Sequence, residues 1–121
     1  MRRGLGDDTG AAAVEFALVL PAFLALTIGT IYVSILMLSV ADLQSAVEEA
    51  ARCASVRTAV CTDQGTVAAY AVSRYGGPGI DPVFTYALAD CGHQVTATAT
   101  FQLVTGMPAA SVPITVTACH P

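Results

Sequence analysis

The hydrophobic residues of this chain follow two different patterns, and the first is a long apolar run. From Phe16 to Ala41 the sequence contains no charged residue and is apolar on every side of a helical projection. As a helix this run would be roughly 39 Å long, which exceeds the bilayer hydrocarbon core of about 30 Å. A chain of 121 residues is too short to bury such a helix. We therefore predict a transmembrane helix over residues 11–41.

Beyond Ala41 the apolar residues occupy one face of a helix. They are Leu43, Ala46, Val47, Ala50 and Ala54, and charged residues lie on the other faces. No glycine or proline interrupts residues 41–60, so the pattern predicts that one helix continues from about Ala11 to Arg57. Glu48 and Arg52 are four residues apart, a spacing that favours an ion pair on the solvated face.

The remaining sequence predicts a short helix followed by strands. Residues 66–75 have helical spacing and end at the turn-forming sequence 76–79, and strands are expected at 83–88, 94–104 and 111–118, with a turn at 105–108. Apolar residues alternate with threonine in the last two strands, which places Val95 opposite Val116, and Pro113 favours an edge position. The prediction is an α+β chain whose exported domain covers residues 42–121, with a two- to three-stranded antiparallel sheet packed on the helix between Leu43 and Ala54.

The charge distribution restricts the possible partners. The five basic residues are all arginines and the net charge is -4, which argues against nucleic acid or anionic lipid as a partner. Arg2 and Arg3 precede the apolar run, so the positive-inside rule predicts a cytoplasmic N-terminus and an extracytoplasmic C-terminal domain. No metalloprotease, P-loop, Rossmann or nucleophile-elbow motif is present, so neither catalysis nor a cofactor is expected.

Four cysteines in a small exported domain suggest disulfide bonds. Proximity along the chain favours Cys53 with Cys61 and Cys91 with Cys119, although two other connectivities are possible. The predicted strand register leaves Cys91 one residue away from the position opposite Cys119. A Cys91–Cys119 disulfide therefore requires an irregular strand end near Gly92. A zinc site that combines cysteines with His93 or His120 is disfavoured because no C-x-x-C spacing occurs, and no metal is expected.

Three kinds of N-terminal leader are compatible with the apolar run. An ordinary secretory signal would be cut after Ser39-Val40-Ala41 and release a binding module that begins at Asp42, but its apolar region should be about 7 to 15 residues long. An uncleaved anchor would retain the leader and present an extracellular binding domain, and it would have no need of Glu15. A prepilin-type leader would be cut before the apolar run and would leave the hydrophobic segment on the mature protein.

The segment from Gly10 through Ala-Ala-Ala-Val-Glu15-Phe16-Ala-Leu-Val-Leu to Pro21 resembles the processing motif of TadE-like minor pilins of the tight adherence (Flp) pilus system. The resemblance extends to about Arg57. It implies a pilin-like helix, a leader over residues 1–10, and cleavage by a prepilin peptidase between Gly10 and Ala11. It also implies residence in the cytoplasmic membrane or a surface pilus, other pilin or pseudopilin subunits as partners, and a role in pilus assembly, priming or adherence.

The resemblance also suggests roles for individual residues of the motif. Cleavage would make Glu15 the fifth residue of the mature chain, where it could pair with the new Ala11 amine of a neighbouring subunit; alternatively, it only extends toward the membrane interface. Phe16 stands where major pilins of the system typically have tyrosine. Pro21 removes a hydrogen bond to the Ala17 carbonyl and either loosens the helix for packing or is an ordinary membrane proline.

Overall fold

The computed structural model describes residues 5–103 and 110–121. Its first element, helix α1, covers Leu5–Val56 and continues through Pro21 without a break. The chain divides into two compact units between Ser34 and Ile35, and each is described by itself. The turn predicted at 105–108 and the end of the strand predicted at 94–104 lie outside the described residues.

In the first unit the apolar side chains of α1 are exposed from Gly10 to Ile31. Three hydroxyl groups in this stretch bond within the helix: Thr27 donates to the Phe23 carbonyl, Thr30 to that of Thr27 and Ser34 to that of Thr30, each at 2.8 Å. These hydroxyls therefore do not require water. Among the described residues, one helix is long and apolar enough to cross a membrane, and it lies within Gly10–Val56.

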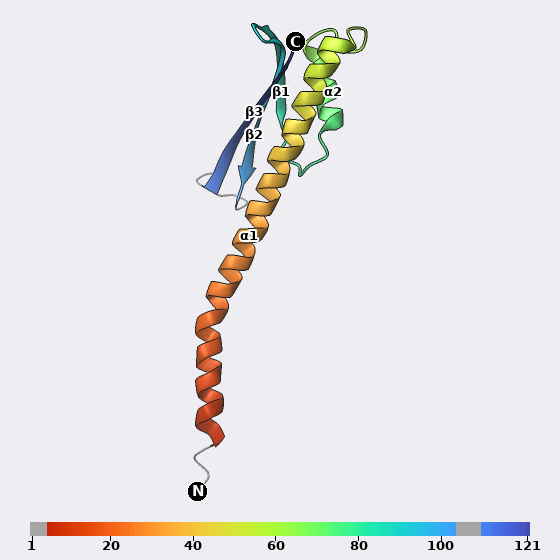
Figure 1. Cartoon of the computed structure of the whole chain (residues 1–121). Helices are drawn as coiled ribbons and strands as arrows, with labels where there is room; N and C mark the ends of the chain where they lie inside the picture. Colours follow the sequence, from red (N-terminus) through yellow and green to blue (C-terminus); the bar gives the residue numbers. More distant parts are fainter. Residues whose placement is uncertain (1–4, 104–109) are drawn as a thin grey trace. The chain divides into compact units, whose positions relative to one another are not determined.

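The second unit contains the end of α1 and four further elements, shown in Figure 1. They are α2 (Gln64–Arg74), β1 (Val83–Ala89), β2 (Gly92–Gln102) and β3 (Ser111–His120). The strands form one antiparallel sheet in the order β1-β2-β3, so β3 with Pro113 is an edge strand. The α+β fold class predicted from the sequence is confirmed.

The core of this unit combines one face of α1 with one face of the sheet. All five α1 residues predicted to face the sheet are buried, and so are the neighbouring Ala51 and Cys53. Helix α2 contributes Val67 and Ala71, and the strands contribute Phe84, Val95, Ala97, Phe101, Ile114 and Val116. Threonines on the other face of the strands are mostly exposed, as their alternation with apolar residues requires.

The pairing of β2 with β3 differs from the predicted register. Val95 lies opposite Ala118, and Val116 lies opposite Ala97, so the predicted pairing of Val95 with Val116 is wrong by two residues. A shift of two residues returns every side chain to the same face, so the hydrophobic pattern cannot distinguish the two registers. The length of the β1–β2 turn and the backbone around Gly92 are not encoded in that pattern.

The β1–β2 turn brings the second pair of cysteines together. Asp90 and Cys91 form a two-residue connection between Ala89 and Gly92, which pair with each other. Gly92 has a φ of +121°, and a Cβ atom there would lie 2.5 Å from the His120 carbonyl oxygen. Only glycine allows this approach. Cys91 is bonded to Cys119, with a Cα–Cα distance of 6.2 Å.

The outer edge of β1 is capped by a side chain of α2. The Gln64 amide nitrogen donates a hydrogen bond to the Phe84 carbonyl at 3.0 Å, and its amide oxygen accepts one from the Tyr86 backbone N–H. A single side chain thus satisfies one donor and one acceptor on the edge strand, in the way that a neighbouring strand would.

Helix α2 begins earlier than predicted because Asp63 acts as its N-cap. The Asp63 carboxylate accepts a hydrogen bond from the Thr66 N–H at 2.8 Å, and the Thr66 hydroxyl accepts one from the Asp63 N–H at 3.0 Å. This reciprocal capping box places the first helical residue at Gln64, whereas periodicity alone suggests Thr66. The hydrogen bonds from Thr66 lower the pKa of Asp63 below its ordinary value of 3.8.

Acid is expected to weaken the start of α2. Because folding lowers the pKa of Asp63, its contribution to stability is present above the unfolded pKa of about 3.8 and is lost as the pH falls through the folded pKa. We expect the protection of the Gly65, Thr66 and Val67 amides against hydrogen exchange, relative to the intrinsic rate at each pH, to fall in this acidic range. An Asp63→Asn variant keeps a capping oxygen that does not titrate, so the same acid-induced loss of protection in that variant would contradict the assignment.

The loop after α2 packs against α1 near the start of the second unit. The Tyr75 hydroxyl donates a hydrogen bond to the Pro78 carbonyl at 2.6 Å. Burial raises the pKa of Tyr75, and the nearby Asp42 carboxylate raises it further. At Gly77 a Cβ atom would lie 2.8 Å from an Asp42 carboxylate oxygen, so the loop approaches α1 closely at this residue.

Candidate functional site

The residues predicted to direct processing and assembly all lie on α1. The Gly10–Ala11 peptide bond is inside the helix, and both residues are exposed. Glu15 lies about one turn beyond Ala11 and is also exposed, with no ion-pair partner among the described residues. Phe16 is 65% exposed, and Pro21 follows further along the same helix. Within this unit the motif therefore presents its side chains outward, where a second protein can contact them.

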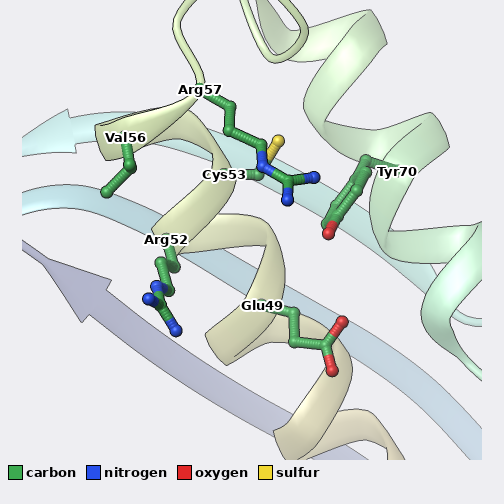
Figure 2. A pocket seen from close by; sticks show the side chains of 6 residues that line it. All are labelled: Glu49, Arg52, Cys53, Val56, Arg57 and Tyr70. Atoms are coloured by element: carbon green, nitrogen blue, oxygen red, sulfur yellow. The ribbon is translucent and has the colours of Figure 1, made fainter.

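A second candidate site is a recess beside the end of α1. Its volume is about 380 Å³, and Figure 2 shows the side chains that line it: Glu49, Arg52, Cys53, Val56, Arg57 and Tyr70. Tyr70 comes from α2, and Arg57 follows the last residue of α1. The Arg57 guanidinium points toward the Tyr70 ring, whereas the Arg52 side chain lies on the other side of the helix turn.

The ion pair at this recess is not the one predicted from sequence spacing. Arg74 of α2 pairs with Glu49 at 3.2 Å and lies over the Tyr70 ring, 5.1 Å from its centroid. Glu48 instead accepts a hydrogen bond from Gln44 at 2.9 Å. The predicted Glu48–Arg52 pair is absent from the described part of the chain, where the Glu48 carboxylate bonds to the Gln44 amide instead.

The backbone of Arg57 is held in place by the turn that ends α1. Its N–H donates to the Cys53 carbonyl at 2.8 Å, and its own carbonyl accepts from Val60 and Cys61 at 2.9 and 3.0 Å. A disulfide joins Cys53 to Cys61 with a Cα–Cα distance of 5.8 Å. The arginine side chain therefore extends from a fixed point beside the recess.

The described residues contain no metal-binding cluster. No group of three or more His, Cys, Asp or Glu side chains is placed to hold a metal in residues 5–103 and 110–121. All four cysteines are in disulfides, so none remains as a zinc ligand. His93 is stacked on Tyr86, and its Nδ1 lies 2.8 Å from the Tyr86 hydroxyl oxygen.

The recess was not identified from the sequence because its parts are distant along the chain. Arg57 and Tyr70 have no fixed spacing in any motif, and only the packing of α2 beside α1 brings them together. One feature of the sequence does indicate a basic site in this region. The chain contains no lysine, and two of its five arginines lie close together at the predicted end of the long helix.

Comparison with known proteins finds a family match that overlaps the first candidate site. No curated protein and no solved structure matches the chain. Residues 10–52 match the family model of the TadE-like proteins. This match begins at the predicted processing glycine and covers the apolar run and most of the outer part of α1. The chain therefore carries a TadE-like region over residues 10–52, which confirms the resemblance seen in the sequence.

Proposed function

We propose that this chain is a minor pilin or pseudopilin of a Tad (Flp) type pilus, anchored in the cytoplasmic membrane by α1 with its C-terminal domain outside. The observation that carries the proposal is the TadE-like match, which starts at Gly10 and covers a helix whose apolar side chains are exposed. An exposed apolar surface of this extent requires lipid or other helices around it. Both environments are available to a pilin-like subunit.

In this proposal a prepilin peptidase cleaves between Gly10 and Ala11 on the cytoplasmic side. The bond is helical in the uncleaved chain, so the backbone around it must leave the helix to enter an active site. Glycine assists this step because it is a weak helix former, by about 0.8–1.0 kcal/mol relative to alanine. Cleavage leaves the entire apolar run on the mature protein.

Cleavage also creates a charged partner for Glu15. A carboxylate at the membrane is costly unless it is paired, and the new α-amino group of Ala11 carries the opposite charge. In a staggered stack of helices, Glu15 of one subunit pairs with Ala11 of the next, which fixes the axial position of each subunit. Other pilin or pseudopilin subunits are therefore the proposed partners.

The burial of Ser39 supports keeping the helix attached to the domain. Ser39 is 0% exposed and donates a hydrogen bond to the Ile35 carbonyl at 2.8 Å. A secretory cut after Ala41 would remove this buried residue from the domain. The proposed function therefore retains α1, and it differs in this respect from a released binding module.

The experiment is an intact-mass measurement of the membrane-extracted protein from its native host, with and without reduction. We expect a chain that begins at Ala11 and gains the mass of four hydrogens on reduction, because both disulfides open. A chain that begins at Asp42 would show an ordinary secretory signal, and one that begins at Met1 in peptidase-competent cells would show an uncleaved anchor. Either of these results would overturn the proposal.

A further inference from the structure

We propose that the recess between α1 and α2 binds carboxylate side chains of an acidic segment in a partner protein, with Arg52 and Arg57 as the binding residues. This interaction goes beyond the proposed pilus function and does not depend on cleavage at Gly10. Its ligand class follows from the charges that line the recess and from how those charges are already paired.

Among the residues that the structure describes, the two arginines are unpaired cations in an acidic domain. From residue 42 onward the chain has six acidic residues and three arginines, namely Asp42, Glu48, Glu49, Asp63, Asp81 and Asp90 against Arg52, Arg57 and Arg74. Arg74 is already paired with Glu49, the carboxylate that lines the recess. In the described residues neither Arg52 nor Arg57 is within ion-pair distance of any carboxylate. Both remaining cations of the domain thus line the recess, Arg57 beside Tyr70 and Arg52 on the other side of the helix turn, so each would bind a separate carboxylate of the segment.

The groups around the recess suit a carboxylate. A guanidinium binds a carboxylate through two parallel N–H donors, and the Tyr70 ring beside Arg57 carries a hydroxyl that can donate a further hydrogen bond. Val56, which is 64% exposed, adds an apolar contact at the rim. An acidic side chain next to an apolar one would therefore use both kinds of surface.

The fixed backbone of Arg57 reduces the entropy lost on binding. Its N–H and carbonyl groups are both hydrogen-bonded in the turn that the Cys53–Cys61 disulfide closes. Only the side chain must become ordered when a ligand enters. The Arg57 side chain consequently provides a directed contact, unlike that of an arginine on a freely moving loop.

The overall charge favours a short acidic segment over a polyanion. A net charge of -4 repels a nucleic acid or an anionic bilayer at long range, and two arginines cannot neutralise many phosphates. A segment with two carboxylates, one for each arginine, is repelled less than a polyanion because it brings little additional charge near the domain. We therefore assign the site to a protein partner.

The test uses the full chain in nanodiscs of zwitterionic lipid and a five-residue capped peptide of alternating glutamate and valine as the probe. Calorimetric titration at low salt should show saturable binding, which weakens at least fivefold in Arg57→Gln and in Arg52→Gln. Glu49→Gln should bind a few-fold more tightly, because it releases Arg74 beside Tyr70. Gln102→Glu is the control, since it makes the same change in net charge at an exposed residue of β2 that does not line the recess.

A second peptide with glutamine in place of glutamate tests the role of the carboxylates and should bind at least fivefold more weakly. Circular dichroism of each variant verifies that the fold is retained. The proposal is overturned if the wild-type chain does not bind the acidic peptide, if the glutamine peptide binds equally well, or if the Gln102→Glu variant loses as much affinity as the two arginine variants.

Discussion

A Glu15→Val variant is expected to be cleaved normally and to be absent from assembled pilus material. Valine fits the apolar surface of α1 and leaves Gly10 and Ala11 unchanged, so the peptidase should still recognise the leader. The Ala11 amine of a neighbouring subunit would then have no carboxylate to pair with in an apolar environment. We expect the amount in sheared filaments, measured by quantitative blotting against the membrane fraction, to fall more than tenfold.

Two further variants separate charge from size in this experiment. Glu15→Asp keeps the carboxylate and should restore part of the incorporation. Thr27→Val removes a polar group from the same helix, where the hydroxyl bonds only to the Phe23 carbonyl, and should behave like the wild type. Incorporation of Glu15→Val at the wild-type level would show that Glu15 merely extends to the membrane interface.

Replacing Cys91 and Cys119 together by alanine is expected to destabilise the exported domain more than replacing Cys53 and Cys61. The two disulfides close loops with sequence separations of 28 and 8 residues. The loop-entropy model gives upper estimates of about 3.6 and about 2.6 kcal/mol for their contributions. In a small domain the first loss is a large part of the total stability.

Denaturant unfolding of the full chain in detergent, followed by the circular dichroism of the sheet, measures both losses. The double variant of Cys91 and Cys119 should have the lower midpoint and a steeper slope, because its unfolded chain is no longer held compact by the cross-link. The double variant of Cys53 and Cys61 is the matched comparison, because it removes the same number of sulfur atoms. A lower midpoint for that second variant would show that the fixed end of α1 contributes more than the longer loop.

The elements of the fold were predictable from local patterns, whereas their pairing was not. The apolar run, the helical face that contains Leu43, and the threonine alternation each depend on neighbouring residues, and these elements are present. The register between Val95 and its partner depends on turn geometry. The alternating pattern does not determine it, because a shift of two residues leaves every side chain on the same face of the sheet. The start of α2 was missed because the Asp63 capping box precedes the first apolar residue.

The two candidate sites likewise differ in whether their residues are neighbours in the sequence. The residues from Gly10 to Pro21 form a contiguous motif, so they were found without knowledge of the fold. Arg57, Tyr70 and the Glu49–Arg74 pair come from separate helices, and sequence spacing instead suggested a local pair between Glu48 and Arg52. A tertiary contact of this kind has no periodic signal in one sequence, because it depends on how two helices pack.

The Gln64 cap on β1 limits how copies of this domain can join. Growth of a continuous sheet from subunit to subunit requires every domain to offer two open edges, one for the preceding copy and one for the next. Here the Phe84 carbonyl and the Tyr86 N–H on one edge are already bonded to Gln64. Strand addition is therefore expected at β3 rather than at β1, so one glutamine limits how far copies of this domain can polymerise through their sheets.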